Sequence, residues 1–171
     1  MKQLLIGAST LMMLPFIACE DNKEDEAKNE VNIIEITTDN VNDGDYYFNF
    51  VEGSKNNASW HLSYKNLDAG DGYYMPSFSL NSSIKLYVEK SLEFEEISTI
   101  PSNNLFSSSN GKLESGGEYE VLTYDMQVHK ISVSNYNYII NETVSNKVFK
   151  IHFDEYSSGV VIFRYAELTS E

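Results

Sequence analysis

Cys19 is the only cysteine in this chain of 171 residues, and the residues before it predict its chemistry. The chain has a charged start and then an apolar stretch of secretory length, which ends in Phe16-Ile17-Ala18-Cys19. An ordinary secretory signal ends in a small-x-small site. An apolar residue, a small residue and a cysteine form instead the lipobox of a bacterial lipoprotein signal. The pattern therefore predicts that residues 1–18 are a signal peptide and that the thiol of Cys19 is acylated.

The alternative interpretation of the apolar stretch is a membrane-spanning anchor. A helix needs about 20 apolar residues to cross a bilayer, but the run from Leu4 to Ala18 is shorter and contains Pro15. A lipid anchor is therefore favoured. Several acyl chains on one cysteine bind a membrane far more firmly than a single chain does. The expected location is the outer membrane, with the folded part lipid-anchored on the cell surface.

Residues 19–30 comprise the acylated cysteine and an acidic tract without a large apolar side chain. Such a tract cannot bury enough surface to offset the entropy of ordering, so we expect a disordered tether. It also resembles the surface-export signal of some gram-negative lipoproteins, and a plain spacer is the alternative. Residues 31–171 are expected to form one domain. Because no second cysteine is available for a disulfide, a hydrophobic core must stabilise that domain.

The charge of the chain narrows the choice of partners. It has 26 acidic and 12 basic residues and a formal net charge of −14. This acidity argues against binding to nucleic acid and against electrostatic attachment to anionic lipid. It is also consistent with a simpler role, which is to keep an exported protein soluble.

From Val31 onward the sequence has the pattern of a β protein. Short runs rich in Val, Ile, Tyr and Phe alternate with clusters of Asn, Asp, Gly and Ser. Ser91–Ile97 is the best helix candidate and is too short to be stable alone. Pro101–Gly117 is polar and is expected to be a long exposed loop. The fold class is all-β and mostly antiparallel, with strands over Val31–Thr37, Tyr46–Glu52, Ser59–Lys65, Tyr73–Leu80, Ile84–Glu89, Glu118–Met126, Lys130–Ser134, Tyr136–Asn141, Lys147–Phe153 and Val160–Leu168.

The motifs of common enzymes are missing from the sequence, so we expect no enzymatic activity. There is no Gly-x-Ser-x-Gly elbow, P-loop, dinucleotide fingerprint or His-Glu-x-x-His. His61 and His152 fall on the polar faces of predicted strands, which favours solvated surface histidines. The remaining enzymatic hypothesis is a pair of carboxylates that hydrolyses a glycosidic bond. The favoured interpretation is instead that these acidic side chains are solvated at the surface. The candidate residues are Asp68, Asp71, Glu95, Glu96 and Glu118.

Several short segments resemble HmuY-like haemophores, a family of bacterial haem-binding lipoproteins. That family closes with an apolar strand, a lysine-containing strand ending in Phe-x-x-Tyr, and a Gly-led strand ending in Phe-x-Tyr. The matching segments here are Tyr138–Ile140, Lys147–Tyr156 and Gly159–Tyr165. Ala58–Tyr64 is similar to the family's Trp-Asp-Leu-x-Phe strand, with His61 at the aspartate position. The resemblance covers residues 45–168.

The resemblance implies an all-β lipoprotein with a "right hand" shape that takes haem from host haemoproteins for a TonB-dependent receptor. Haem is held between β fingers by two axial ligands, which are histidines or methionines. Matching the family's ligand-bearing stretch to Val121–Met126 places one ligand at Met126. The other ligand is expected at about residues 85–100, where neither His nor Met occurs. Tyr87 could supply an oxygen ligand there, and Met75 and His61 are substitutes from elsewhere in the chain.

The high aromatic content supports an alternative function. The chain has 12 tyrosines, 9 phenylalanines and 1 tryptophan. Exposed aromatic side chains stack on sugar rings and anchor protein partners. The alternative is therefore a non-enzymatic surface lipoprotein that binds a glycan, a peptide or a partner protein. It predicts that Tyr46, Tyr47, Tyr73, Tyr74 and Tyr136 form one exposed patch remote from Met126.

Overall fold

The computed structural model describes residues 32–108, 112–113 and 117–169. Cys19, the predicted signal peptide and the predicted acidic tether lie outside these residues. In the described part of the chain, no helix is long and apolar enough to cross a membrane. The strands pair in antiparallel fashion throughout, which confirms the all-β, mostly antiparallel prediction.

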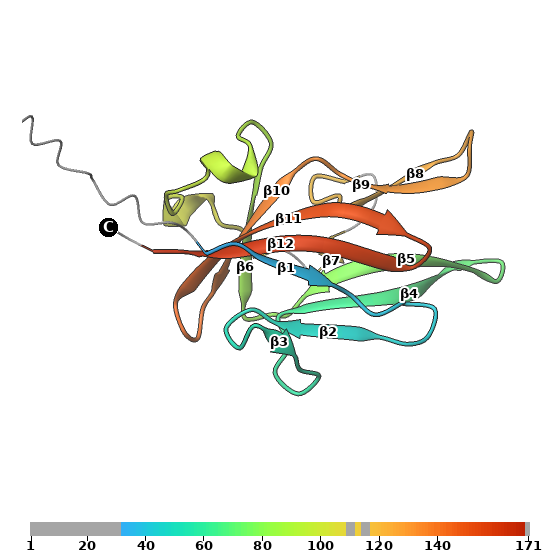
Figure 1. Ribbon diagram of the computed structural model, residues 1–171, viewed down its shortest axis with the longest axis horizontal. Helices are drawn as coiled ribbons and strands as arrows, with labels where there is room; N and C mark the ends of the chain where they lie inside the picture. Colours follow the sequence, from blue (N-terminus) through green and yellow to red (C-terminus); the bar gives the residue numbers. More distant parts are fainter. Residues whose placement is uncertain (1–31, 109–111, 114–116, 170–171) are drawn as a thin grey trace, which may run out of the picture.

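The strands form two five-stranded sheets and one separate hairpin (Figure 1). The first sheet has the order β1 (Ile34–Thr37), β12 (Val160–Leu168), β11 (Lys147–Ser157), β10 (Asn137–Glu142) and β6 (Ile84–Glu89). The second has the order β3 (Ser54–Lys55), β2 (Tyr46–Asn49), β4 (Leu62–Gly70), β5 (Tyr73–Leu80) and β7 (Lys112–Leu113). The hairpin consists of β8 (Leu122–Asp125) and β9 (Lys130–Val133), and two 3-10 turns are η1 (Phe94–Glu96) and η2 (Asn103–Leu105).

Aromatic side chains from both sheets make up much of the core. The ring of Phe48 on β2 meets Phe163 on β12 edge to face, with centroids 5.6 Å apart. The ring centroid of Phe78 on β5 lies 4.8 Å from that of Phe153 on β11. All four side chains are buried, and such ring pairs add stability beyond their buried area. The alternation along each strand therefore directs one face of each sheet into a shared core, as the sequence predicts.

Two hairpins extend toward one end of the molecule, and both chain ends of the described domain lie toward the other (Figure 1). The β4–β5 hairpin turns at Asp71 and Gly72, which both have positive φ, at 54° and 80°. Such a two-residue turn suits the twist of the flanking strands. β4 runs on to Gly70, beyond the predicted strand Ser59–Lys65, so the turn between the two strands is shorter than the sequence predicts. The β8–β9 hairpin turns over residues 126–129.

The outer face of the first sheet is covered as well. The segment around η1 packs on β11, and it joins a second apolar cluster that includes Ile97, Phe106, Ile139 and Val148. Lys150, on the predicted polar face of β11, is only 1% exposed. Its ammonium group donates to the carbonyl oxygens of Phe94 and Ile97, each at 2.8 Å. The predicted polar face of this strand is therefore an interface within the fold.

The prediction of a long exposed loop over Pro101–Gly117 is partly wrong. Phe106 and Leu113 are buried, and Ser107 pairs with Leu86 of β6 through two backbone hydrogen bonds of 2.9 Å. Leu113 belongs to β7, which pairs with β5. Two apolar residues are enough to dock this polar segment, because its backbone completes the edges of both sheets. Strands of two residues, β3 and β7, carry too little pattern to be predicted.

Candidate functional site

The two hairpins share an apolar cavity of about 170 Å³. Strands β4 and β5 hold register with Leu67 opposite Met75, so both side chains come from the same rung of the hairpin. The β8–β9 hairpin closes the other side of the cavity. The principal lining residues are Leu67, Met75 and Pro76 from the first hairpin and Leu122, Thr123 and Ile131 from the second.

Large apolar side chains are exposed along both hairpins. On the β4–β5 hairpin, Tyr73 is 73% exposed and Tyr74 is 64% exposed. On the β8–β9 hairpin, Met126 is 78% exposed and Val128 is 67% exposed. Concentrations of exposed apolar side chains mark interaction or ligand-binding sites more often than isolated ones do. Together with the cavity, they make the space between these hairpins the candidate functional site.

Both methionines that follow the predicted signal peptide lie on these hairpins. Of the five methionines in the chain, three precede residue 19, and the others are Met75 and Met126. Met75 is half-buried and lines the shared cavity. Met126 is in the β8–β9 turn, three residues after Thr123, which also lines the cavity. Three residues of extended chain span about 10 Å, so Met126 is near the tip rather than in the cavity.

Local hydrogen bonds set the shape of the β8–β9 turn. The carboxylate of Asp125 accepts the N–H of Gln127 at 2.8 Å, so β8 ends directly before Met126. The hydroxyl of Tyr124 lies 2.7 Å from Nδ1 of His129, whose φ is 50°. Met126 and His129 could share a metal only if the strand breaks between them. The structure has that break, and both residues belong to the exposed turn.

His61 has a geometry that does not suit iron ligation. It is 8% exposed, so the prediction of a solvated histidine is wrong for this residue. Its Nδ1 accepts the backbone N–H of Phe50 at 3.1 Å. A neutral imidazole has one N–H and one acceptor nitrogen, so Nε2 carries the proton and has no free lone pair for a metal. His152, on β11, is half-buried, and its Nδ1 lies 2.8 Å from the amide oxygen of Asn137.

Tyr87 lies on β6, away from both hairpins. Its hydroxyl donates to the carboxylate of Glu89 at 3.0 Å, and its ring packs against Phe106. Burial, and then this hydrogen bond, raise the pKa of the Tyr87 hydroxyl above its usual value. An iron-bound tyrosine is deprotonated, so this environment opposes ligation. Of the four candidate ligands, the structure brings together only the hairpins that carry Met75 and Met126.

The candidate carboxylates occupy separate places. Glu95 is paired with Arg164 at 2.6 Å, and the carboxylate of Glu96 accepts the N–H of Glu93 at 3.1 Å. Asp68 lines the hairpin cavity and accepts the N–H of Gly70 at 2.8 Å. Within the described ranges, no three His, Cys, Asp or Glu side chains gather as a metal site.

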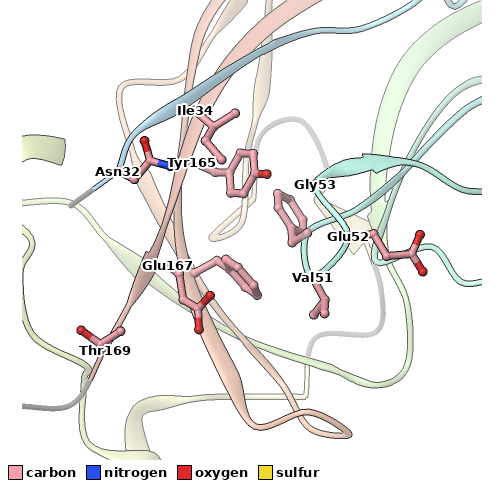
Figure 2. Close-up of a pocket in the computed structure, with 10 residues that line it drawn as sticks. Asn32, Ile34, Val51, Glu52, Gly53, Tyr165, Glu167 and Thr169 are labelled. Carbon is pink, nitrogen blue, oxygen red and sulfur yellow. The ribbon is translucent and has the colours of Figure 1, made fainter.

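A larger cavity of about 610 Å³ lies toward the start of β1 and the end of β12, at the opposite end of the fold from the two hairpin tips (Figure 1). Figure 2 shows Tyr165 and Glu167 of β12 on one side and the Val51–Gly53 turn on the other. Buried rings of Phe50 and Phe149 form part of its wall. None of the four candidate ligands lines it, so its size does not make it the candidate haem site.

The five tyrosines of the alternative hypothesis do not form one exposed patch. Tyr46 is buried in the core. Tyr47 packs against Trp60 with ring centroids 5.7 Å apart, and the half-buried Tyr136 lies under the ammonium group of Lys90. Only Tyr73 and Tyr74 are exposed, and both belong to the candidate hairpin site.

No protein-family model and no curated protein matches the chain.

Leu67 and Val128 are members of the hairpin surface that sequence reasoning did not single out. The sequence did contain a signal for both residues, because each is an apolar residue close to a turn. Leu67 pairs with Met75, and Val128 is in the same turn as Met126. Which two hairpins lie together, however, depends on contacts distant in the sequence.

Proposed function

We propose that this protein is a lipid-anchored surface lipoprotein that binds haem between the β4–β5 and β8–β9 hairpins, in the manner of HmuY-like haemophores. The observation that carries the proposal is the position of Met75 and Met126. They are the only methionines after the predicted signal peptide, and they lie on two hairpins that line one cavity. The family resemblance supports Met126 as one axial ligand, and Met75 is the second.

The hairpin surface suits a flat apolar cofactor. Cofactor sites are mostly apolar clefts of about 300–1,000 Å³, and the cavity of about 170 Å³ is smaller. It would hold one edge of the macrocycle, and the exposed side chains of Tyr73, Tyr74 and Val128 would cover the rest. Thioether sulfur is a soft ligand and favours ferrous over ferric iron. Haem binding should therefore be tighter under reducing conditions.

The placement of the site agrees with a role in haem uptake. The hairpin tips lie toward the end of the molecule opposite the start of β1 (Figure 1). The predicted tether from Cys19 joins the domain near the start of β1, so the lipid anchor is not attached beside these tips. The "right hand" of the proposed architecture would then be accessible to host haemoproteins, and bound haem could be passed to a TonB-dependent receptor.

A haem titration with conservative variants tests this function. The mature domain is titrated with haemin, oxidised and with dithionite, and the Soret band is recorded. Met75→Leu and Met126→Leu keep apolar volume and remove the sulfur. Each should weaken binding of reduced haem by at least about tenfold, a loss of about 1.4 kcal/mol. Val144→Leu, in the exposed turn between β10 and β11, is the matched control and should bind haem as the wild type does.

Two results would contradict the proposal. A folded wild-type domain that gives no Soret shift in either redox state does not bind haem. A shift that survives in both leucine variants excludes the methionine ligands. The alternative, binding of a glycan, peptide or partner protein through a tyrosine patch, is less favoured because Tyr46 and Tyr136 are not part of an exposed patch.

A further inference from the structure

A further cavity of about 400 Å³, with polar and apolar residues in its lining, lies at the other end of β4 from the proposed haem site. It is lined near the start of β4 by Trp60 and His61, and Glu142 contributes from the end of β10. From Leu62 to Gly70, β4 spans about 27 Å, so the two sites are distinct. The volume is within the usual range for small-molecule sites.

His61 presents an unused hydrogen-bond donor to this cavity. Burial lowers its pKa below the usual value, although the nearby carboxylates of Glu142 and Glu52 oppose the shift. The imidazole is therefore neutral, and Nδ1 is occupied by the N–H of Phe50. The proton on Nε2 has no acceptor among the hydrogen bonds of the described residues. This N–H group therefore remains available to a ligand with an acceptor oxygen that enters the cavity.

Glu142 presents an acceptor to the same cavity. It is 3% exposed, and its carboxylate accepts the N–H groups of Val144 at 3.0 Å and Ser145 at 2.6 Å. Burial raises its pKa, but the hydrogen bonds from Ser145 and Val144 outweigh burial and keep the pKa below its usual value. The carboxylate is therefore ionised at neutral pH. Its two oxygens accept about four hydrogen bonds, so acceptor capacity remains for a ligand.

Trp60 supplies a flat apolar surface beside this donor and acceptor. It is the only tryptophan in the chain and is half-buried. Its carbonyl oxygen accepts the side-chain amide of Asn81 at 2.9 Å, and its ring packs against Tyr47. The hydrogen bond fixes the backbone at Trp60 and the ring contact restrains the indole before a ligand arrives, which lowers the entropic cost of binding.

We propose that the cavity of Trp60, His61 and Glu142 binds a neutral saccharide. A sugar hydroxyl can accept from Nε2 of His61 and donate to the carboxylate of Glu142, and the C–H face of the ring packs on the indole. An anion would meet the carboxylates of Glu142 and Glu52. A cation would face the N–H of His61, and a metal ion would find no lone pair on Nε2. The site is independent of haem binding.

The fluorescence of Trp60 provides a direct test, because no other tryptophan contributes. The purified mature protein is titrated with D-glucose, D-galactose and N-acetyl-D-glucosamine, with excitation where tyrosine does not absorb. Inorganic phosphate and tetramethylammonium are the charged probes. The expected result is a saturable change with at least one sugar and none with either ion. No saturable change with any of the sugars, or saturation with an ion alone, overturns the proposal.

Two variants locate the binding. His61→Asn keeps an acceptor for the N–H of Phe50 and removes the Nε2 donor, and Glu142→Gln keeps the shape and removes the charge. Each should weaken sugar binding about tenfold, as expected for loss of a hydrogen bond in a buried site. Glu167→Gln, in the neighbouring cavity, is the matched control and should bind as the wild type does. Thermal melting confirms that each variant is folded. Unchanged affinity in both site variants would overturn the proposal.

Discussion

Replacement of Lys150 by methionine should destabilise the domain, because the buried ammonium group holds the η1 segment on β11. Its two hydrogen bonds, to the carbonyl oxygens of Phe94 and Ile97, are each 2.8 Å long. The ammonium also lies 4.4 Å from the centroid of the Phe94 ring. Methionine preserves most of the apolar stem, so the substitution isolates the contribution of the charged group.

The expected loss is about 2 kcal/mol. Each buried carbonyl left without a donor costs about 1–3 kcal/mol, or about 2–6 kcal/mol for the pair. The cation–π contact adds about 1–2 kcal/mol in a desolvated site. Against these losses, removing the ammonium relieves a desolvation penalty of several kcal/mol. That penalty is real here, because burial lowers the pKa of Lys150 below its usual value.

Urea unfolding of Lys150→Met measures this loss. The midpoint should fall while the slope stays constant, since a change in midpoint alone reports stability. Hydrogen exchange should show early opening of residues 93–98 while β10 and β11 stay protected. Lys147→Met is the matched control on the same strand. Its ammonium makes an exposed 2.8 Å ion pair with Glu167, so its loss should cost less than about 1 kcal/mol.

The result for Lys150→Met can also refute the reasoning. A variant as stable as the wild type, or more stable, would show that desolvation of the ammonium equals or exceeds its hydrogen bonds, as happens for some buried ion pairs. Equal losses of unfolding free energy in Lys147→Met and Lys150→Met would show that burial does not determine how much a lysine contributes to the stability of the domain.

Two further predictions concern pH and the lipid anchor. Burial raises the pKa of Tyr46, Tyr64 and Tyr138 above the usual value of about 10. Because these tyrosines lose their protons more readily in the unfolded chain, the urea midpoint should fall as the pH rises above about 10. A midpoint that stays constant over this pH range would contradict the burial of the three hydroxyl groups. The Cys19→Ala variant should not be cleaved at the lipoprotein signal-peptide site and should lose membrane association, while residues from Val31 onward still fold. Equal partitioning of variant and wild type into detergent would exclude acylation of Cys19.

Local sequence pattern determined the position of the strands. Every segment predicted as a strand overlaps one in the structure, because period-two alternation depends only on neighbouring residues. The run Val160–Phe163 is apolar at every position, which is typical of a central strand, and β12 does lie between β1 and β11. Its two faces differ, however, since Val161 is fully buried and Ile162 only half-buried.

Tertiary structure alone decided which polar side chains are buried. Lys150 and His61 occupy strand positions that sequence reasoning assigned to solvent, but segments distant in the sequence cover them. The carbonyl oxygens that bind Lys150 are 56 and 53 residues away. A polar side chain can be buried wherever such partners satisfy it, and strand alternation contains no information about them.

The candidate site shows the same division. The sequence alone determined that only Met75 and Met126 follow the predicted signal peptide, and that both stand near turn residues. It did not determine that their hairpins lie together, since β4–β5 and β8–β9 share no strand pairing. Their shared cavity results from how both hairpins pack on the sheets. Packing of this kind depends on the shape of the whole core, which no local pattern specifies.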